Sequence, residues 1–220
     1  KTKPFVLLAG ISGTGKSRLA RTLAYNTCSK EELRQNLHKP GNFELIPVRP
    51  NWHDSSELMG YVSRISGEKY ICTTFLKFIG KAWKNLETPF ILCLDEMNLA
   101  PVEQYFAEYL SIIETRQVQD NTIKTDFIIS KASFENGNLY DQLVSDLKLD
   151  SNEFSEGIGI PSNLVVIGTV NMDETTHSFS RKVLDRAMTF EMNEIDLKAG
   201  LESSDNDWSY PEKFISTGDV

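Results

Sequence analysis

Residues 10–17 of the chain read GISGTGKS, and this segment restricts the possible folds more than any other part of the sequence. It matches the pattern G-x-x-x-x-G-K-[ST] at every fixed position, which a chain of 220 residues would do by chance on the order of 1 time in 100. An apolar run at residues 4–9 precedes it, and a helical pattern begins at Lys16. A glycine-rich loop between a buried strand and a helix gathers backbone N–H groups around phosphate oxygens. The segment therefore predicts a phosphate-binding loop within an α/β fold.

The loop also predicts which side chains contact a nucleoside triphosphate. We expect contacts from the loop and the residue after it, namely Gly10, Ile11, Ser12, Gly13, Thr14, Gly15, Lys16, Ser17 and Arg18. Lys16 would supply a cation to the β- and γ-phosphates, and the Ser17 hydroxyl would be a ligand of Mg²⁺. The alternative interpretation is a glycine turn followed by a solvated lysine.

The rest of the chain alternates apolar runs with helical patterns. Strands are predicted at residues 4–9, 43–48, 90–96, 164–168 and 187–192, and helices at 16–25, 74–86, 101–113, 139–149 and 178–184. We further expect a hairpin within residues 116–130 and a loop over residues 149–161. Strands that alternate with helices form parallel sheets with right-handed crossovers. The predicted fold is a five-stranded parallel sheet flanked by helices.

Two carboxylates end the strand FILCLDE, which covers residues 90–96. Ligands of open α/β sheets bind at the carboxyl ends of strands, so Asp95 is the expected second ligand on the Mg²⁺ side. Glu96 would point in a different direction and act as the general base that polarises the attacking water, which contributes roughly 10²–10⁴ in rate. Alternatively, both are solvated acids at the end of an ordinary strand.

Two further residues are candidates for the hydrolytic step. Asn171 follows the strand LVVIGTV and could hold the attacking water beside the γ-phosphate, or it could simply cap the turn. Arg186 lies between a helix and the last strand, where it could reach the nucleotide of a neighbouring subunit, with an effect of about 10³–10⁵ in rate. A surface ion pair with Asp185 is the alternative, and Arg181 and Arg116 are the other candidate arginines.

Charge and cysteine content exclude several classes of protein. The net charge is −8, and residues 111–220 contain 9 basic and 20 acidic residues. A surface this acidic binds duplex phosphates weakly, so we expect any DNA to be contacted mainly through other domains or subunits. The three cysteines are scattered, and Cys93 is predicted to be a buried, inert thiol. No apolar run is long enough to span a membrane and no secretory signal is found, so a cytoplasmic protein without membrane contacts is expected.

The motifs together resemble those of the AAA+ ring ATPases. The phosphate loop is followed in order by DEMN at residues 95–98, GTVN at 168–171 and LDR at 184–186. Within AAA+ proteins the chain is most similar to the McrB-type motor of modified-cytosine restriction systems, in the helix-2-insert branch. There the first sensor signature reads M-N-T-A-D, whereas residues 170–174 here read V-N-M-D-E.

The resemblance implies a domain organisation. Residues 1–196 would form the AAA+ nucleotide-binding core, with a helix-2-type insertion at 49–74 and a hairpin insertion at 116–161 before the sensor strand. Residues 197–220 would be a polar tail or the start of a truncated helical lid, and no second sensor is assigned. Because the chain starts at Lys1, we expect it to be a domain of a longer protein.

The resemblance also implies a function. The expected activity is Mg²⁺-dependent hydrolysis of ATP or GTP by a homo-oligomeric ring, a hexamer, that works with a McrC-like nuclease subunit on DNA. One alternative is a MoxR-like chaperone that remodels a protein partner. Another is a scaffold that is gated by nucleotide binding and does not hydrolyse it. The sequence leaves the choice between ATP and GTP open.

Overall fold

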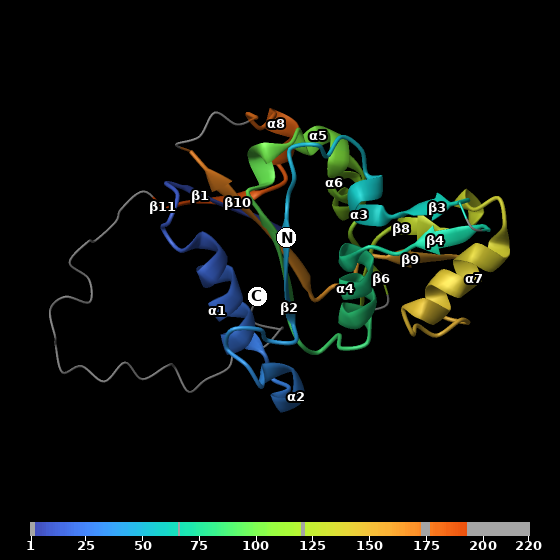
Figure 1. Ribbon diagram of the computed structural model, residues 1–220. Helices are drawn as coiled ribbons and strands as arrows, with labels where there is room; N and C mark the ends of the chain where they lie inside the picture. The colour runs from blue at the N-terminus through green and yellow to red at the C-terminus, as the bar shows by residue number, and fades with distance from the viewer. Residues whose placement is uncertain (1–2, 66, 120–121, 173–176, 193–220) are drawn as a thin grey trace, which may run out of the picture.

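A five-stranded parallel sheet forms the centre of the computed structural model, which describes residues 3–65, 67–119, 122–172 and 177–192. The strand order is β11 (Met188–Met192), β1 (Phe5–Gly10), β10 (Leu164–Asn171), β5 (Phe90–Asp95) and β2 (Phe43–Pro47), as Figure 1 shows. All four neighbouring pairs are parallel. The predicted five-stranded parallel α/β fold is confirmed.

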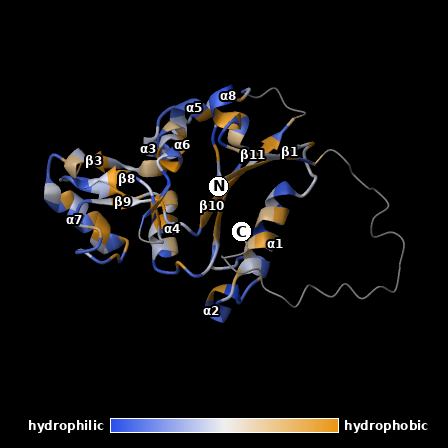
Figure 2. Ribbon diagram, turned by 180° about the vertical axis from the view of Figure 1, so that it is seen from behind, coloured by the Kyte–Doolittle hydropathy of each residue, from blue (hydrophilic) through white to orange (hydrophobic). Residues whose placement is uncertain are grey.

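Helices cover both faces of this sheet, because its strands carry apolar side chains on both faces. Leu8 and Cys93 pack under α1 (Lys16–Thr27), whereas Leu7 and Leu92 face the larger layer of helices on the opposite side. That layer contains α3 (Ser56–Met59), α4 (Thr74–Trp83), η1 (Met97–Leu99), α5 (Val102–Tyr105) and α6 (Ala107–Glu114). Figure 2 shows hydrophobic residues along β1 and β10 between the two layers. Strands buried on both faces read as continuous apolar runs, which is why the sequence predicts them well.

The remaining elements lie outside the sheet layers. They include α2 (Glu31–Arg34), the antiparallel pair β3 (Tyr61–Ser63) and β4 (Lys69–Ile71), η2 (Lys131–Ser133), α7 (Gly137–Asp146) and α8 (Arg181–Leu184). The predicted insertion at residues 49–74 therefore consists mainly of α3 and the β3–β4 hairpin.

The hairpin predicted within residues 116–130 is shorter than expected. Only β6 (Gln117–Gln119) and β7 (Thr122–Lys124) pair with each other, whereas β8 (Phe127–Ser130) pairs with β9 (Gly157–Gly159). β9 lies in the segment predicted to be a loop, so that prediction is wrong. A Cβ atom at Gly157 would lie 2.3 Å from Cγ of Phe127, so this glycine permits close strand packing and does not mark a turn.

The helix predicted over residues 101–113 is divided in two. Phe106, with φ of −113°, separates α5 from α6. Its ring is fully buried, stacks on Tyr109 at a centroid distance of 4.6 Å and lies 5.3 Å from the ring of Phe5 on β1. Packing of these aromatic rings against the sheet accounts for a break that helical periodicity does not reveal.

The structure also bears on the cysteine and membrane predictions. Cys93 is fully buried, as predicted, and burial raises the pKa of its thiol to about 12. Among the described residues, no helix has the length and apolar character needed to cross a bilayer. The predicted tail or lid at 197–220, and Asp173 of the sensor signature, lie outside the described residues.

Candidate active site

The loop between β1 and α1 has the backbone geometry of an anion site. Gly13 and Gly15 have φ of 82° and 83°, in the left-handed region that glycine adopts without strain. Gly15 occupies the N-cap position of α1 and carries no side chain that could cap the helix. The first N–H groups of a helix have no partner within the helix, and the positive end of the helix dipole lies there. The loop thus presents several N–H donors to one anion.

Lys16 brings a buried cation into this loop. The side chain is 5% exposed, and its ammonium group donates hydrogen bonds to the carbonyl oxygens of Gly10 at 3.0 Å and Ile11 at 2.7 Å. Thr14 Oγ1 lies 3.4 Å from the same nitrogen. The loop therefore holds the charge of Lys16 beside the N–H groups that precede α1.

Ser17 and Asp95 meet at the carboxyl ends of the strands. Ser17 Oγ, on α1, donates to Asp95 Oδ1, at the end of β5, over 2.5 Å. Thr169 Oγ1, on β10, donates to the same carboxylate oxygen over 2.8 Å. One carboxylate is thus fixed by two hydroxyl groups from two different elements, although the three residues are separated by up to 152 positions in the sequence.

Glu96 points in a different direction from Asp95 because its backbone leaves the strand. Its φ of 54° lies in the left-handed region, which is uncommon for a residue with a side chain. The backbone N–H of Glu96 donates to Thr169 Oγ1 over 2.9 Å, and Asn171 Nδ2 donates to Glu96 Oε1 over 3.1 Å. Asn98 Nδ2 in turn donates to the carbonyl oxygen of Asn171 over 3.2 Å. Residues at functional sites often hold such sparsely populated conformations.

These side chains line one cleft with a volume of about 260 Å³. The lining residues are Ser12, Gly13, Gly15, Lys16, Ser17, Arg18, Asp95, Glu96, Thr169 and Asn171. Of the other predicted contacts, Gly10 and Ile11 accept hydrogen bonds from Lys16, and Thr14 Oγ1 donates to the carbonyl of Ile11. The volume is slightly below the ~300–1,000 Å³ usual for small-molecule sites.

The oxygen atoms at the cleft fit Mg²⁺. Ser17 Oγ and Asp95 Oδ1 are hard oxygen ligands that lie 2.5 Å apart and face the same space as Lys16. Mg²⁺ takes only one or two protein ligands and completes its shell with water and substrate phosphates. In the part of the chain that the structure describes, no group of three or more His, Cys, Asp or Glu side chains could form a cage for a metal ion.

Arg186 does not lie in this cleft. It precedes β11, at the amino ends of the strands, whereas Lys16 follows their carboxyl ends. Arg186 Nη2 forms an ion pair with Glu114 Oε2 at 2.6 Å, and Nη1 donates to the carbonyl of Lys182 over 2.6 Å. The partner of Arg186 is thus Glu114 and not the Asp185 considered from the sequence. Within one chain, Arg186 is therefore not part of the cleft that contains Lys16.

Thr169 is the residue of this site that sequence analysis missed. The signal that could have revealed it is its spacing, because residues two apart on a strand face the same side and Thr169 precedes Asn171 by two. Its side chain is 2% exposed and contacts both carboxylate-bearing residues, through the Asp95 oxygen and the Glu96 backbone.

Replacing Thr169 by valine should weaken the use of Mg²⁺. The change removes the hydroxyl that orients Asp95 and keeps the shape of the side chain. A hydrogen bond to a charged group contributes about 1.5–3 kcal/mol, so we expect the Mg²⁺ concentration for half-maximal turnover to rise about 10-fold or more. Phosphate release measured over a Mg²⁺ titration checks this, with Thr169→Ser as the control that retains the hydroxyl. An unchanged Mg²⁺ requirement in the valine variant would contradict the role of Thr169.

A comparison with protein families agrees with this fold. A family model described as the AAA domain of the dynein-related subfamily matches residues 5–187. No curated protein matches the chain significantly. The similar solved structures include a candidate ATPase from Cytophaga hutchinsonii, at 16% identity and a TM-score of 0.45 over 90% of this chain and 44% of that chain. They also include PCH-2 from C. elegans, at 15% identity and a TM-score of 0.31 over 86% of this chain and 35% of that chain. The chain spans less than half the length of either solved protein.

Proposed function

Because the chain belongs to the dynein-related subfamily of AAA domains and is a P-loop NTPase, we propose that it is the motor domain of a ring that hydrolyses ATP or GTP with Mg²⁺. We further propose that the ring is McrB-like and drives a restriction or defence nuclease on DNA. The fold and family are properties of the chain itself, whereas the nuclease and the DNA belong to the proposal.

One observation supports hydrolysis above all others. Side chains from α1, from β5 and the residue after it, and from β10 converge on the loop cleft, and together they suit the hydrolysis of a nucleoside triphosphate. A scaffold that only binds nucleotide needs Lys16 and Ser17, but it has no need of Glu96 held by Asn171 at 3.1 Å. The presence of this pair favours turnover over simple binding.

Each side chain of the cleft has a separate role in the proposed hydrolysis. The loop N–H groups and Lys16 bind the β- and γ-phosphates and stabilise the charge that develops on them. Ser17 and Asp95 would hold Mg²⁺, which supplies further neutralisation of that charge when it is bound. Glu96 accepts the proton of the attacking water, and Asn171 orients both this carboxylate and the water. Thr169 orients the carboxylate of Asp95 and the backbone of Glu96.

Arg186→Ala should spare nucleotide binding by isolated subunits and reduce turnover in the assembled ring. The proposed role is charge stabilisation on the nucleotide of the neighbouring subunit, for which effects of about 10³–10⁵ in rate are typical of such arginines. Turnover of rings mixed from wild-type and Arg186→Ala subunits, at increasing variant fractions, measures the effect. Loss of nucleotide binding by the isolated variant would instead indicate that Arg186 acts within its own subunit or supports the fold.

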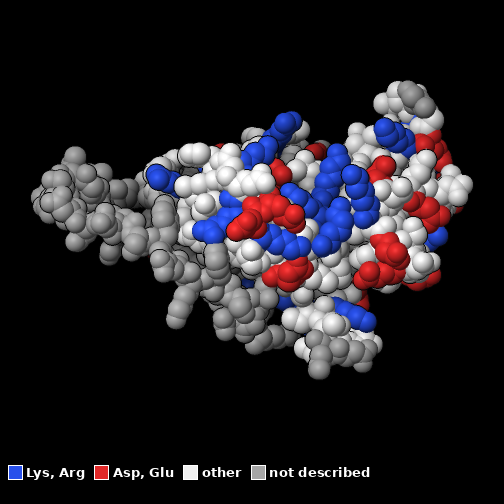
Figure 3. Space-filling view, turned by 90° about the horizontal axis from the view of Figure 1, so that it is seen from below, with Lys and Arg blue, Asp and Glu red and all other residues white. Residues whose placement is uncertain are grey.

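The charge of the surface fits a DNA partner that is held mainly by other domains or subunits. Figure 3 shows a band of Lys and Arg side chains on the face seen from below, with Asp and Glu side chains on both sides of it. Several surface cations have acidic partners, such as Lys30 with Glu87 and Lys131 with Asp141. A surface of mixed charge attracts phosphates less than a uniformly positive surface does.

One feature favours the second candidate function, which is remodelling of a protein in the manner of a MoxR-like chaperone. The β3–β4 hairpin, within the predicted insertion at 49–74, exposes apolar side chains: Ile65 at its tip is 94% exposed, and Tyr61 at its base is 55% exposed. Exposed apolar side chains on a projecting hairpin suit contact with a polypeptide better than contact with a phosphate backbone.

Turnover measurements on the assembled protein test these proposals. Phosphate release from Mg-ATP and Mg-GTP should be far above that of the Lys16→Ala variant and should increase when the partner substrate is added. Stimulation by duplex DNA together with a McrC-like nuclease subunit supports the restriction motor, and stimulation by an unfolded polypeptide supports the chaperone. Nucleotide binding without any release of phosphate would overturn both in favour of a scaffold.

A further inference from the structure

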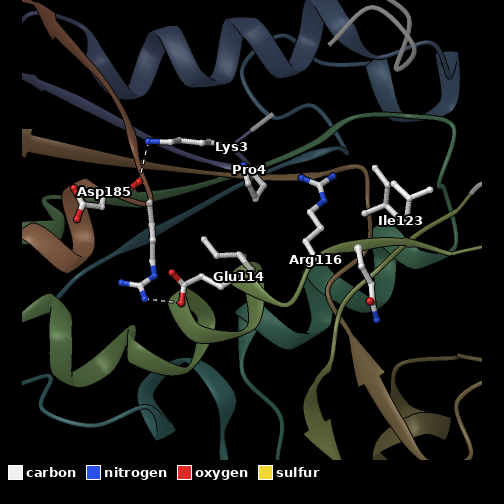
Figure 4. A pocket seen from close by; sticks show the side chains of 10 residues that line it. Lys3, Pro4, Glu114, Arg116, Ile123 and Asp185 are labelled. Carbon is white, nitrogen blue, oxygen red and sulfur yellow. Dashed lines mark hydrogen bonds and ion pairs between the residues drawn. The ribbon is translucent and has the colours of Figure 1, made fainter. Parts of the chain in front are cut away.

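Polar side chains are organised differently at the two ends of the central sheet. At the amino ends of β1 and β11, around a cavity of about 590 Å³, Lys3 and Glu114 form separate contacts with the segment before β11, as Figure 4 shows. At the carboxyl ends, the hydrogen bonds of Glu96, Asn98 and Asn171 are linked to one another. Asn98 is thus connected to both groups that act on the attacking water in the proposed reaction.

Asn98 lies in a short turn, η1, that begins directly after Glu96. The chain leaves β5 at Glu96, whose φ of 54° changes its direction. The hydroxyl of Tyr105, on α5, donates to the carbonyl of Met97 over 2.9 Å and holds the turn against the helical layer. The side chain of Asn98 is only 3% exposed. The buried turn therefore determines where this side chain lies.

The side chain of Asn98 takes the place of a neighbouring strand beside Asn171. The pairing of β10 with β5 extends only to Gly168. Beyond it, the N–H of Met172 donates to the carbonyl of Gly10 on β1 over 3.2 Å. The C=O and N–H of one planar trans peptide point in opposite directions, so the carbonyl of Asn171 faces the side where β5 has ended. Asn98 Nδ2 donates to this carbonyl over 3.2 Å and satisfies an acceptor of a buried residue.

Asn171 is therefore held at two points by one turn. Its backbone carbonyl accepts from Asn98, and its own Nδ2 donates to Glu96 Oε1 over 3.1 Å. Glu96 and Asn98 are close neighbours in the sequence, at the start of the turn and within it. Two contacts between the same two segments restrict the backbone and the side chain of Asn171 together, whereas one contact leaves the side chain free to turn.

We propose that Asn98 is a positioning residue for hydrolysis, which holds the backbone of Asn171 so that its amide group is aimed at Glu96 and the attacking water. The proposal rests on the proposed function and adds a residue that does not line the nucleotide cleft. A misplacement of about 1 Å near a reacting group can cost about 10²-fold in rate. Nucleotide binding depends instead on the loop around Lys16, which Asn98 does not contact in the hydrogen bonds described here.

Asn98→Leu removes the donor and keeps most of the volume of the side chain. The carbonyl of residue 98, which accepts from the N–H of His177 over 3.0 Å, is retained. In the full-length assembled protein at saturating Mg-ATP or Mg-GTP, the turnover number should fall about 10-fold, the equivalent of one hydrogen bond. The dissociation constant for nucleotide should change by less than about twofold, because only the arrangement for reaction is altered.

The Asn171→Ala background separates positioning from a structural role. This variant keeps the carbonyl that Asn98 contacts but lacks the side chain that Asn98 is proposed to aim. Adding Asn98→Leu to Asn171→Ala should therefore leave the turnover number nearly unchanged, because the two residues act as a unit. A general structural defect would lower the turnover number by the same factor in both backgrounds.

Asn163→Leu is the matched control. Asn163 is a buried asparagine directly before β10, and its Nδ2 donates to the carbonyls of Ala82, Asn85 and Thr88 over 3.2, 2.8 and 2.7 Å. Its replacement should lower the melting temperature, because these carbonyls lose their donor, and should leave the turnover number unchanged in the folded protein. A loss of stability alone is thereby distinguished from a loss of positioning.

Asn98→Ala is the second variant, in case leucine at this position prevents folding. It should lower turnover in the same direction, and again only where the side chain of Asn171 is present. Wild-type turnover in a folded Asn98 variant would overturn the proposal, as would equal fold losses with and without the side chain of Asn171. Weakened nucleotide binding in the variants would also overturn it. Absence of turnover in the wild type would instead remove the proposed function itself.

Discussion

Replacement of Lys16 by alanine is expected to abolish detectable nucleotide binding. The ammonium group sits within the loop, held by the carbonyl oxygens of Gly10 and Ile11, and a bound triphosphate would accept hydrogen bonds from it. Each charge-assisted hydrogen bond contributes about 1.5–3 kcal/mol, so loss of two weakens binding by roughly 10²–10⁴. Titration calorimetry with Mg-ATP and Mg-GTP measures the effect.

Two further variants show whether the positive charge of Lys16 is what binds the nucleotide. Lys16→Met keeps most of the length of the side chain and should bind as poorly as the alanine variant. Lys84→Ala removes an exposed lysine that donates to the carbonyl of Leu147, and it should bind nucleotide normally. Suppose that Lys16→Ala melts normally and that its dissociation constant for nucleotide lies within twofold of wild type. The loop at residues 10–17 would then not be the site that binds the phosphates.

The sheet and the phosphate loop could be predicted because short, continuous stretches of sequence specify them. β1, β5 and β10 are buried on both faces, so each appears as an apolar run whatever its neighbours are. The loop depends on a short pattern in which Gly13 and Gly15 take backbone angles that other residues avoid. Asp95, Glu96 and Asn171 followed from the rule that ligands bind where parallel strands end.

Other features depend on contacts between distant segments, which a single sequence does not reveal. Thr169 matters because β10 lies next to β5, so that its hydroxyl reaches Asp95 across 74 positions. The Arg186–Glu114 pair likewise joins α6 to the segment before β11. β9 was missed because its two glycines suggest a turn, whereas Gly157 is required by the ring of Phe127 on β8.

Glu96→Gln should retain nucleotide binding and lower the turnover number by about 10²–10⁴, the contribution of a general base. The substitution keeps the size of the side chain, and the glutamine carbonyl can still accept the hydrogen bond that Asn171 Nδ2 donates over 3.1 Å. The left-handed backbone at residue 96 and its N–H bond to Thr169 are also unaffected. Only the ability to take a proton is lost. Rings of this variant should therefore accumulate uncleaved nucleotide, which chromatography of the bound nucleotide after incubation detects.

Glu108→Gln is the matched control, because Glu108 is an exposed glutamate that accepts a hydrogen bond from Ser55 outside the cleft, and its turnover should equal that of wild type. Asn171→Ala provides a second comparison. If Asn171 acts by orienting Glu96, its removal should lower turnover in the wild-type background but add little to the loss in Glu96→Gln, because groups that act as a unit are not additive. Equal turnover of Glu96→Gln and wild type would show that the water is activated without this carboxylate, and the unusual backbone of Glu96 would then need a different explanation.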